Sequence, residues 1–311
     1  MTSPKLNDDE FIAQFEANGA KALAIIAGVA ERDIYRRRRT LEAKYSRIIS
    51  APNQRVESKP RINLDLDDGT IVVFSDCHYW PGEAPLMHKI LLKVIKKLKP
   101  KLVIANGDVC DFASISRFAP LGWEDAPTVI EELEVCQKRM EEVRQASGDA
   151  MLIWTAGNHD MRFEAAFAKH LPEMAKVKGV HLKDHFPHWP TAWSVWINDE
   201  IVIKHRLYGG MNALRNNVMK SRKHCVTGHL HSANVYANTG YENDTLYGID
   251  CGTIADTYGP QFMYCEDNPR DWRSAFGVLT LDKGRLLRPE LCQKLGTHAA
   301  EFRGSVIEIS A

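Results

Sequence analysis

The chain has 311 residues, 44% of them hydrophobic, and its 40 basic side chains are balanced by 40 acidic ones. This length suits one large α/β domain, or a large and a small one. A net charge of zero excludes a global attraction to nucleic acid or membranes, so any basic surface must be local. No apolar stretch approaches the ~20 residues that cross a bilayer, and the acidic, polar start differs from a signal peptide. We therefore expect a cytoplasmic protein with no membrane partner.

Residues 1–45 are predicted to form a small all-α domain. Apolar residues at helical spacing indicate a first helix from residue 9 that Asn18 and Gly19 end, and a second helix runs from 20 to about 27. Gly28 then provides a turn before a third helix. The side chains expected to fill the angle between these helices, or to lie on the inner side of the third one, are Val29, Ile34, Leu41 and Tyr45.

This arrangement of small and apolar residues resembles the helix-turn-helix of DNA-binding repressors and homeodomain-like modules. Ala30 departs from it, because Ser or Thr usually caps the third helix there. In such modules the third helix enters the major groove of DNA. Three arginines at i, i+4 and i+7 share one face of that helix and are the candidate nucleic-acid contacts: Arg32, Arg36 and Arg39. The alternative is that the arginines solvate a helix that links or dimerises protomers.

Residues 46–60 contain several breakers, and we interpret them as a linker to a large domain at 61–295, followed by a C-terminal tail at 296–311. Strands are predicted at 61–66, 71–74, 101–104, 151–154, 201–203, 225–227, 246–252, 276–281 and near 306–309, and helices at 84–98, 127–146 and 161–170. Two loops are candidate walls of a substrate site: residues 112–126, with Arg117, Phe118 and Trp123, and the aromatic-rich residues 258–272.

Five of the predicted strands end in loops of small residues and potential metal ligands. Such strand ends let polar side chains converge on one point, so we expect the active site there. The seven cysteines form no C-x-x-C pair, and Cys77 and Cys110, which lie inside two of these loops, are predicted to be buried spacers. The loops are Ser75-Asp76-Cys77-His78, Asn106-Gly107-Asp108-Val109-Cys110-Asp111, Gly157-Asn158-His159-Asp160, His205, and Gly228-His229-Leu230-His231.

In order, these loops reproduce the five motifs of the calcineurin-like metallophosphoesterase superfamily, over residues 71–232. Arg206 stands where a glycine is common in relatives. The resemblance implies an α/β fold, a four-layer α-β-β-α sandwich of two mixed sheets, preceded here by the small helix-turn-helix domain. The layout also resembles phage and prophage members described as DNA-repair-type exonucleases, which would place the protein in the host cytoplasm.

Hydrolysis of a phosphodiester needs positive charge on the phosphoryl oxygens and a nucleophile that is already deprotonated. Two divalent cations about 3.5–4 Å apart supply both through a bridging water. Oxygen and imidazole ligands without thiolate suit Mn first, with Fe, Zn, Ni or Mg as alternatives. The resemblance implies that one cation takes Asp76, His78, Asp108 and His231, and that the other shares Asp108 and takes Asn158, His205 and His229.

The resemblance also implies that His159 is no ligand but protonates the leaving oxygen or stabilises the transition state, and that Asp111 orients it. Arg162, in the first turn of the next helix, is a candidate clamp on a phosphate oxygen, and Asp160 is expected to be a structural hydrogen-bond acceptor. Four further histidines lack the strand-end context and are expected outside the metal shell: His170, His181, His185 and His188.

We therefore predict a hydrolase of phosphate esters, a metal-dependent phosphodiesterase with DNA as its substrate. The alternative is a phosphomonoesterase or cyclic-nucleotide phosphodiesterase whose N-terminal helices only form a homodimer. A DNA-binding regulator with a decayed catalytic domain is disfavoured, because the ligand set is intact.

Overall fold

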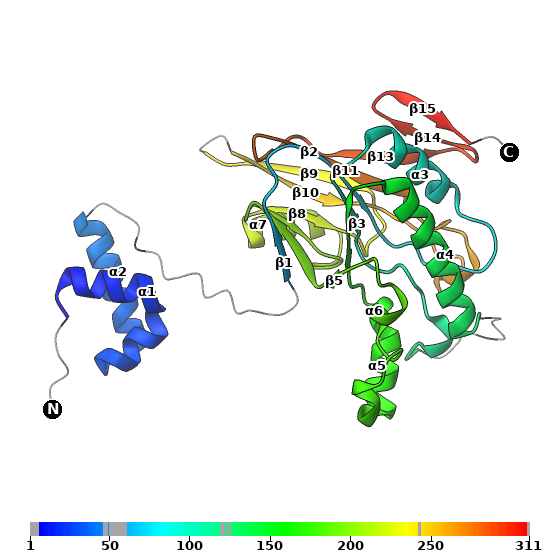
Figure 1. The fold of residues 1–311 in the computed structure, drawn as a ribbon. Helices are drawn as coiled ribbons and strands as arrows, with labels where there is room; N and C mark the ends of the chain where they lie inside the picture. The colour runs from blue at the N-terminus through cyan, green and yellow to red at the C-terminus, as the bar shows by residue number, and fades with distance from the viewer. Residues whose placement is uncertain are drawn as a thin grey trace. The chain divides into compact units, whose positions relative to one another are not determined.

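The structure is a computed structural model that describes residues 6–45, 49, 61–118, 122, 126–241 and 244–309, without the side chains of residues 31, 32, 39 and 43. The side chains of Arg32 and Arg39, and the whole of Trp123, therefore lie outside the described residues. The chain divides into two compact units, residues 1–58, here the helical unit, and residues 59–311, here the sheet unit (Figure 1).

The described part of the helical unit consists of α1 (Asp8–Ala27) and α2 (Glu31–Tyr45). Gly19 interrupts the helical backbone of α1 with φ 76° and ψ 174°, a conformation that glycine adopts without strain. Gly28 ends α1 in the left-handed conformation at φ 64°. The three helical segments expected from the sequence are therefore present.

The helical unit has its own hydrophobic core. Phe11 and Phe15 are buried and stack with ring centroids 6.1 Å apart. Ile34 and Leu41 are each 3% exposed and form the inner side of α2, as predicted. Ile49, which falls in the expected linker, is also buried in this core.

Two side chains predicted to belong to this core do not, so the prediction was wrong for them. Val29 is 45% exposed, because its backbone amide closes the end of α1 on the Ala24 carbonyl and the residue lies in the cap, beyond the angle between the helices. Tyr45 is 41% exposed at the last residue of α2, where its hydroxyl donates to the Asp8 carboxylate.

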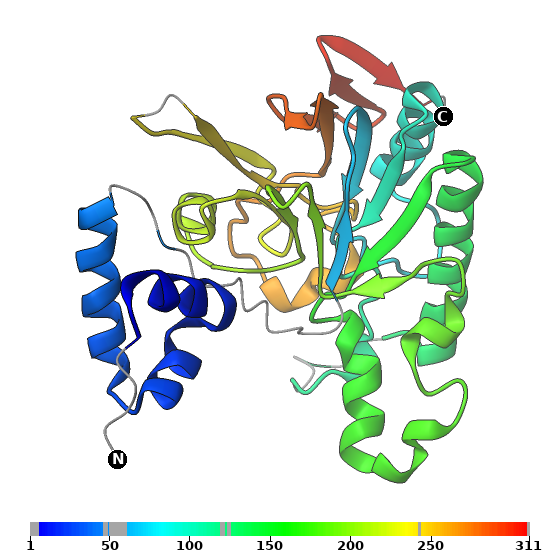
Figure 2. The same cartoon turned by 60° about the vertical axis from the view of Figure 1, so that its left-hand side comes forward.

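The sheet unit contains two mixed sheets, which Figures 1 and 2 show from two sides. The nine described strands of the larger sheet are, in spatial order, β15 (Ser305–Glu308), β14 (Ala299–Phe302), β13 (Glu290–Leu295), β11 (Ala275–Asp282), β2 (Gly69–Phe74), β3 (Leu102–Ala105), β4 (Met151–Thr155) and β5 (Thr191–Ala192), with β12 (Arg285–Leu286) paired to β11. The six described strands of the smaller sheet are β1 (Arg61–Leu64), β6 (Ser194–Ile197), β7 (Ile201–Ile203), β8 (His224–Thr227), β10 (Thr245–Asp250) and β9 (Asn234–Thr239).

The described helices of the sheet unit connect these strands along the chain. None of the described helices is both long and apolar enough to cross a membrane. They are α3 (Leu86–Leu98), α4 (Val129–Ser147), α5 (Asp160–His170), α6 (Leu182–His185) and α7 (Ala213–Ser221), with short 3-10 turns η1 (Ala113–Ile115), η2 (Pro172–Lys176) and η3 (Pro260–Cys265).

Alternate side chains of β2 enter two different cores, because successive residues of a strand face opposite sides of its sheet. Ile71 and Val73 pack against the smaller sheet, whereas Val72 and Phe74 pack with the apolar faces of α3 and α4. On the other side of the smaller sheet, α7 lies so close to β10 that a Cβ on Gly248 would come 2.9 Å from a backbone oxygen of the helix. The predicted α/β fold with two mixed sheets between helices is confirmed.

Three expectations for the sheet unit need correction. The strands β5, β6, β9, β12, β13 and β14 were not predicted. Residues 296–311 do not form a separate tail, since β14 and β15 extend the larger sheet and Ala300 is fully buried. Finally, β1 and β2, which are consecutive in the chain, belong to different sheets, because the chain crosses from one sheet to the other near Asp67.

The strands that precede the five loops end at the same level. In the larger sheet, Phe74 pairs with Ala105 and Ala105 pairs with Trp154, all in parallel strands. In the smaller sheet, the parallel pairing of β7 and β8 sets Ile203 beside Val226. Carboxyl ends of parallel strands are where ligand sites form in α/β folds, and this register delivers the loops from both sheets to one place.

Candidate metal centre

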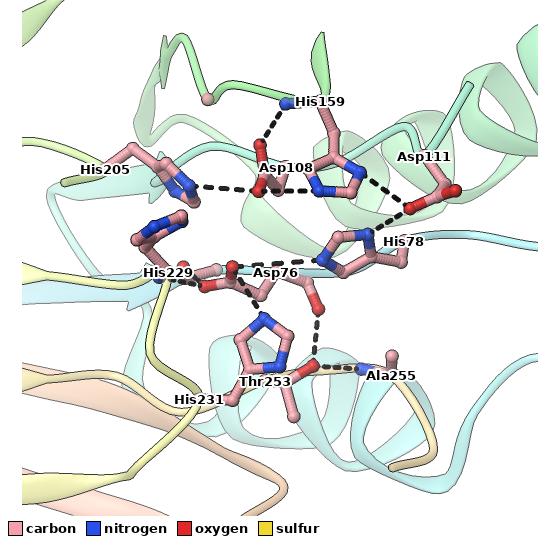
Figure 3. Close-up of polar contacts among 12 residues, drawn as sticks. Asp76, His78, Asp108, Asp111, His159, His205, His229, His231, Thr253 and Ala255 are labelled. Atoms are coloured by element: carbon pink, nitrogen blue, oxygen red, sulfur yellow. Dashed lines mark hydrogen bonds and ion pairs between the residues drawn. The ribbon is translucent and has the colours of Figure 1, made fainter. Parts of the chain in front are cut away.

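The first carboxylate at this place belongs to Asp76, which is fully buried after β2 (Figure 3). Its Oδ1 atom lies 3.0 Å from His231 Nε2, and its Oδ2 atom accepts a hydrogen bond from the backbone amide of His229 at 2.8 Å. The Ser75 hydroxyl also donates to Oδ2. Asp76 is therefore held by both histidines of the loop that follows β8, a strand of the other sheet.

The second carboxylate belongs to Asp108, which is 1% exposed after β3. Its Oδ2 atom lies 3.0 Å from His205 Nε2, and its Oδ1 atom accepts from the backbone amide of His159 at 2.8 Å. The other ring nitrogen of His205 donates to the backbone oxygen of Asn106 at 2.9 Å, which fixes the orientation of the imidazole. Figure 3 shows Asp108 between His205 and His159.

These side chains form two groups of potential ligands in the described part of the chain. Within each group, the possible ligand atoms lie within 4.8 Å of one another. A third group, His78, Asp111 and His159, shares a histidine with one of them. The two groups are Asp76, His78 and His231, and Asp108, His205 and His229.

Three buried polar atoms in these loops have neither a hydrogen-bond partner nor a carboxylate oxygen within hydrogen-bond distance among the described residues. Such orphaned atoms are rare in proteins, because an unmatched buried polar group loses its hydration without compensation. Each is an imidazole nitrogen or a carboxamide oxygen, which are ligand atoms for divalent transition metals. They are His78 Nε2, Asn158 Oδ1 and His231 Nδ1, so the donor set fits metal ions.

The charges of the site support the same interpretation. Burial raises the pKa of Asp108, but His205 and His159 outweigh it and hold that pKa well below its usual value. Conversely, burial lowers the pKa of His205, but the Asp108 and Asp76 carboxylates outweigh it and raise that pKa to about 10. Carboxylates that stabilise a positive charge on a neighbouring imidazole this strongly would also stabilise a divalent cation bound in place of the proton.

The backbone at the centre is strained. Asp76, His78, Asp108, His229 and His231 have φ values of 55°, 39°, 51°, 73° and 57°, in the left-handed region that residues other than glycine seldom adopt. Each such residue costs on the order of 1–3 kcal/mol and clusters of them mark functional sites. All five are residues that the sequence assigned to the metal shell.

Two motif glycines are required because another motif approaches them closely. A Cβ on Gly157 would overlap the Asp108 carboxylate and backbone nitrogen, and a Cβ on Gly228 would overlap the Ser75 hydroxyl and the Asp76 carboxylate. The glycines of the third and fifth loops therefore leave room for the carboxylates of the second and first.

His159 and Asp111 lie together at the edge of the centre, as predicted. His159 Nδ1 is 2.8 Å from Asp111 Oδ1, and the same oxygen is 2.7 Å from His78 Nδ1. Burial lowers the pKa of His159, but Asp111 and Asp108 outweigh it and raise that pKa above its usual value, which favours the protonated ring. Arg162 donates to the Asp111 backbone oxygen at 2.8 Å and lies 3.3 Å from His159 Nε2, so its guanidinium borders the same space.

Asp160 is the structural acceptor that the sequence predicted. Its Oδ1 atom accepts from the backbone amides of Val109 and Cys110 at 2.9 and 3.1 Å, and its Oδ2 atom accepts from those of Asp108 and Gly157 at 2.9 and 2.8 Å. One side chain thus ties the third loop to the second. Cys77 and Cys110 are fully buried, which confirms them as spacers.

Two residues that support the centre were missed in the sequence. The Thr253 hydroxyl donates to the Asp76 backbone oxygen at 2.6 Å, as Figure 3 shows. Asp250 Oδ1 accepts from the backbone amides of Ser232, Ala233 and Gly252 at 3.1, 3.3 and 2.8 Å, which fixes the loop of His231. Asp250 is the last residue of β10, and Thr253 follows that strand. In the sequence, the end of a sixth predicted strand was the only signal for them.

The aromatic loop at 258–272 borders the centre through Phe262 and Trp272. The ring centroid of Phe262 lies 5.1 Å from that of His78 and 5.7 Å from that of His231. The ring centroid of Trp272 lies 4.5 Å from that of His231. Arg36 belongs to the helical unit.

Comparison with known proteins agrees with this geometry. Residues 69–246 match the family model described as Calcineurin-like phosphoesterase, which covers more than half of the chain. The chain therefore belongs to the calcineurin-like phosphoesterase family, whose members are hydrolases of phosphate esters that bind divalent metals.

No curated protein matches the chain. Among solved structures, 48 chains match, and one of them is a single mutant of Vps29 from Entamoeba histolytica. That match has 13% sequence identity and a TM-score of 0.37, and it covers 78% of this chain and 99% of that chain.

We expect that Gly157→Ala destabilises the protein by roughly 1–3 kcal/mol, because the new methyl group overlaps Asp108 and Asp160 prevents the loop from moving. Hydrolysis of a chromogenic phosphodiester should fall about 100-fold, the usual effect of a small displacement at a reacting centre. Gly240→Ala is the matched control, since a Cβ there meets nothing within 4 Å. Urea unfolding and steady-state kinetics measure both effects, and a Gly157→Ala protein equal to its control would contradict this account of the loop.

Proposed function

We propose that the protein is a divalent-metal-dependent phosphodiesterase that acts on DNA and uses two cations. The observation that carries the proposal is the pair of ligand groups around Asp76 and Asp108, together with the three orphaned ligand atoms beside them. When bound, the two cations supply positive charge to the phosphoryl oxygens and lower the pKa of a nucleophilic water. One cation would be held by Asp76, His78, Asp108 and His231, and the other by Asp108, Asn158, His205 and His229.

Manganese ranks first among the candidate metals. The proposed ligands are carboxylate and carboxamide oxygens and imidazole nitrogens, with no thiolate, a mixture that suits Mn and also admits Fe, Zn, Ni or Mg. The neutral carboxamide of Asn158 adds a ligand without adding negative charge, so the centre stays cationic enough to attract a phosphate.

The remaining polar groups of the centre would act on the ester itself. His159, with its pKa raised by Asp111 and Asp108 against the effect of burial, can hold a proton for the leaving oxygen. Asp111 contacts Nδ1 of that ring and so leaves Nε2 for the substrate. Arg162 borders Nε2 at 3.3 Å, where a guanidinium can bind a non-bridging phosphate oxygen.

The helical unit supports DNA as the substrate. Arg37 and Arg38 are used inside the unit, since Arg37 donates to the Leu6 backbone oxygen at 2.8 Å and Arg38 stacks on Phe15. Arg36, in contrast, exposes 76% of its side chain and pairs only with Asp33 on its own helix in the described residues. The backbone positions 32 and 39 lie four residues before and three after it, on the same face of α2. This face is the one that would contact DNA phosphates in a helix-turn-helix module.

One observation favours the alternative, in which the helical unit serves only for dimerisation. Ile25, Ile26 and Val29 are 76%, 55% and 45% exposed at the end of α1. Clustered exposed apolar side chains can mark a protein interface. In that case the enzyme would be a phosphomonoesterase or a cyclic-nucleotide phosphodiesterase.

A substrate panel tests the proposal. With Mn²⁺ we expect the full-length protein to degrade linear, circular or single-stranded DNA and to hydrolyse bis(p-nitrophenyl) phosphate, and chelation with EDTA should stop both reactions until Mn²⁺ is restored. Product gels and absorbance measure the two activities. Turnover of only p-nitrophenyl phosphate or a cyclic nucleotide would reject the nuclease in favour of the alternative.

The role of His159 is tested by His159→Asn. We expect kcat for the diester to fall roughly 100- to 10,000-fold, the range that a general acid contributes, while the metal content stays at the wild-type value. The control is His298→Asn, at an exposed histidine far along the chain. Metal content from inductively coupled plasma mass spectrometry decides the outcome, because loss of metal in His159→Asn would make this histidine a ligand instead.

The role of the exposed arginine is tested by Arg36→Ala. We expect weaker DNA binding, and the slope of log K against log salt should decrease in magnitude by about 0.9, the value for one phosphate contact. Lys21→Ala removes an exposed cation from α1 and is the control. Fluorescence anisotropy with a duplex at several salt concentrations provides the slopes, and equal slopes for Arg36→Ala and wild type would reject the DNA-binding role of this face.

A further inference from the structure

A cavity of about 1010 Å³ opens beside the proposed metal centre. Asn158, His205 and Arg162 line its inner end, so it is continuous with the centre. From there it follows α5 as far as His170 and η2, and at 1.5 Å per helical residue the distance from Arg162 to His170 is roughly 12 Å. The cavity is thus a groove that leads away from the reacting position, here named the α5 groove.

The α5 groove is strongly cationic, although the chain as a whole has no net charge. Among the described residues that line it, Glu164 is the one carboxylate, and it lies 3.5 Å from His181. A groove with this charge balance attracts a polyanion and raises its local concentration. The five arginines and lysines that line it are Arg117, Arg162, Lys169, Lys204 and Arg206.

Two aromatic side chains in the same groove are exposed instead of buried. Phe118 is 66% exposed and Trp193 is 48% exposed, and both line the groove, from different elements of the sheet unit. On α5, the wall between the cations is built from Met161, Ala165 and Ala168, whose small or flexible side chains leave room beside the helix. Large aromatic rings left open to water next to cations are suited to stack on flat, apolar groups of a charged ligand.

We propose that the α5 groove binds a single strand of nucleic acid on its way to the metal centre. This inference rests on the function proposed above and names the form of its substrate. Cations spaced along a groove follow the phosphate backbone, and exposed aromatic rings stack on unpaired bases, which is the recognition pattern for single strands without sequence preference. Arg162, at the inner end, would bind the phosphate that is cut, and the cations farther along the groove would bind the phosphates next to it.

The same features disfavour two other polyanions. In a duplex the base faces are stacked on one another, so Phe118 and Trp193 could not reach them, and the rings would remain exposed to water. A phosphopeptide carries isolated phosphates and would use one or two of the cations, leaving the others unmatched. A strand of several nucleotides uses both the row of cations and the rings.

Steady-state kinetics of the full-length protein with Mn²⁺ test the groove. The substrates are the tetranucleotides (dT)4 and (rU)4, a duplex hairpin, a phosphoserine peptide and bis(p-nitrophenyl) phosphate. The tetranucleotides are short, so that contacts with the helical unit add little to the comparison. The measured quantity is the ratio of kcat/KM for each polymer to kcat/KM for the small diester.

We expect Trp193→Ala to lower this ratio for a tetranucleotide roughly five- to 150-fold, the value of stacking on one aromatic side chain. Lys169→Glu should also lower it, because an anion replaces a cation beside the phosphates. Matched controls lie outside the groove: Tyr241→Ala, at a fully exposed ring between β9 and β10, and Lys183→Glu, at an exposed cation on α6. Both controls should keep the wild-type ratio. A lower ratio for the hairpin than for the tetranucleotides in the wild type is the second expected result.

Three outcomes overturn the inference. The groove is no strand site if its variants and the controls change the ratio equally, if the hairpin is the better substrate in a groove-dependent manner, or if only the phosphopeptide loses activity in the variants. Failure of the proposed function is distinguishable, because then the wild-type protein cleaves neither tetranucleotide while still hydrolysing the small diester.

Discussion

The burial of two neighbouring carboxylates is the constraint on which the rest of the sheet unit depends. Asp76 and Asp108 are at most 1% exposed, and two like charges inside a protein repel each other and lose their hydration. Close contacts compensate for this cost: an imidazole lies 3.0 Å from each carboxylate, and a backbone amide donates a hydrogen bond to each at 2.8 Å. Because these contacts come from loops of both sheets, the centre forms only when the two sheets face each other in the correct register.

The loops store strain in order to make those contacts. Five residues of the centre have left-handed backbones, and Gly157 and Gly228 leave room for carboxylates that any side chain would displace. Two further buried carboxylates hold the loops in place through backbone amides. Burial is the main cause that raises the pKa of Asp160 to about 6 and that of Asp250 to about 7. The hydrogen bonds that each carboxylate accepts from backbone amides oppose this shift. The large apolar cores on both faces of the larger sheet can offset these local costs, which amount to a few kcal/mol each.

The sequence indicated this centre because each motif is local: a buried strand runs directly into a loop with ligands at fixed spacing, and one register brings the loops together. The roles of Thr253 and Asp250 were not predicted, because each acts through contacts with residues that are distant in the chain. The strands β9, β13 and β14 were not predicted because these half-exposed strands carry few large apolar residues, and the tail was misjudged for the same reason. In the helical unit, spacing predicted Ile34 correctly but could not show that the cap turns Val29 toward solvent.

In the proposed function, chemistry and substrate choice belong to different parts of the sheet unit. The metal centre is built from strand ends that the cores hold rigid, whereas the α5 groove is built from one helix and peripheral loops whose side chains bear little of the core. Arg162 is the residue common to both, because it lines the groove and also donates to the Asp111 backbone beside His159. A ligand that draws this guanidinium toward its phosphate therefore changes the surroundings of the catalytic imidazole as well. If the groove and the centre act as proposed, binding along the groove and proton transfer at the centre would be coupled through that one side chain, and groove variants should then alter kcat as well as KM.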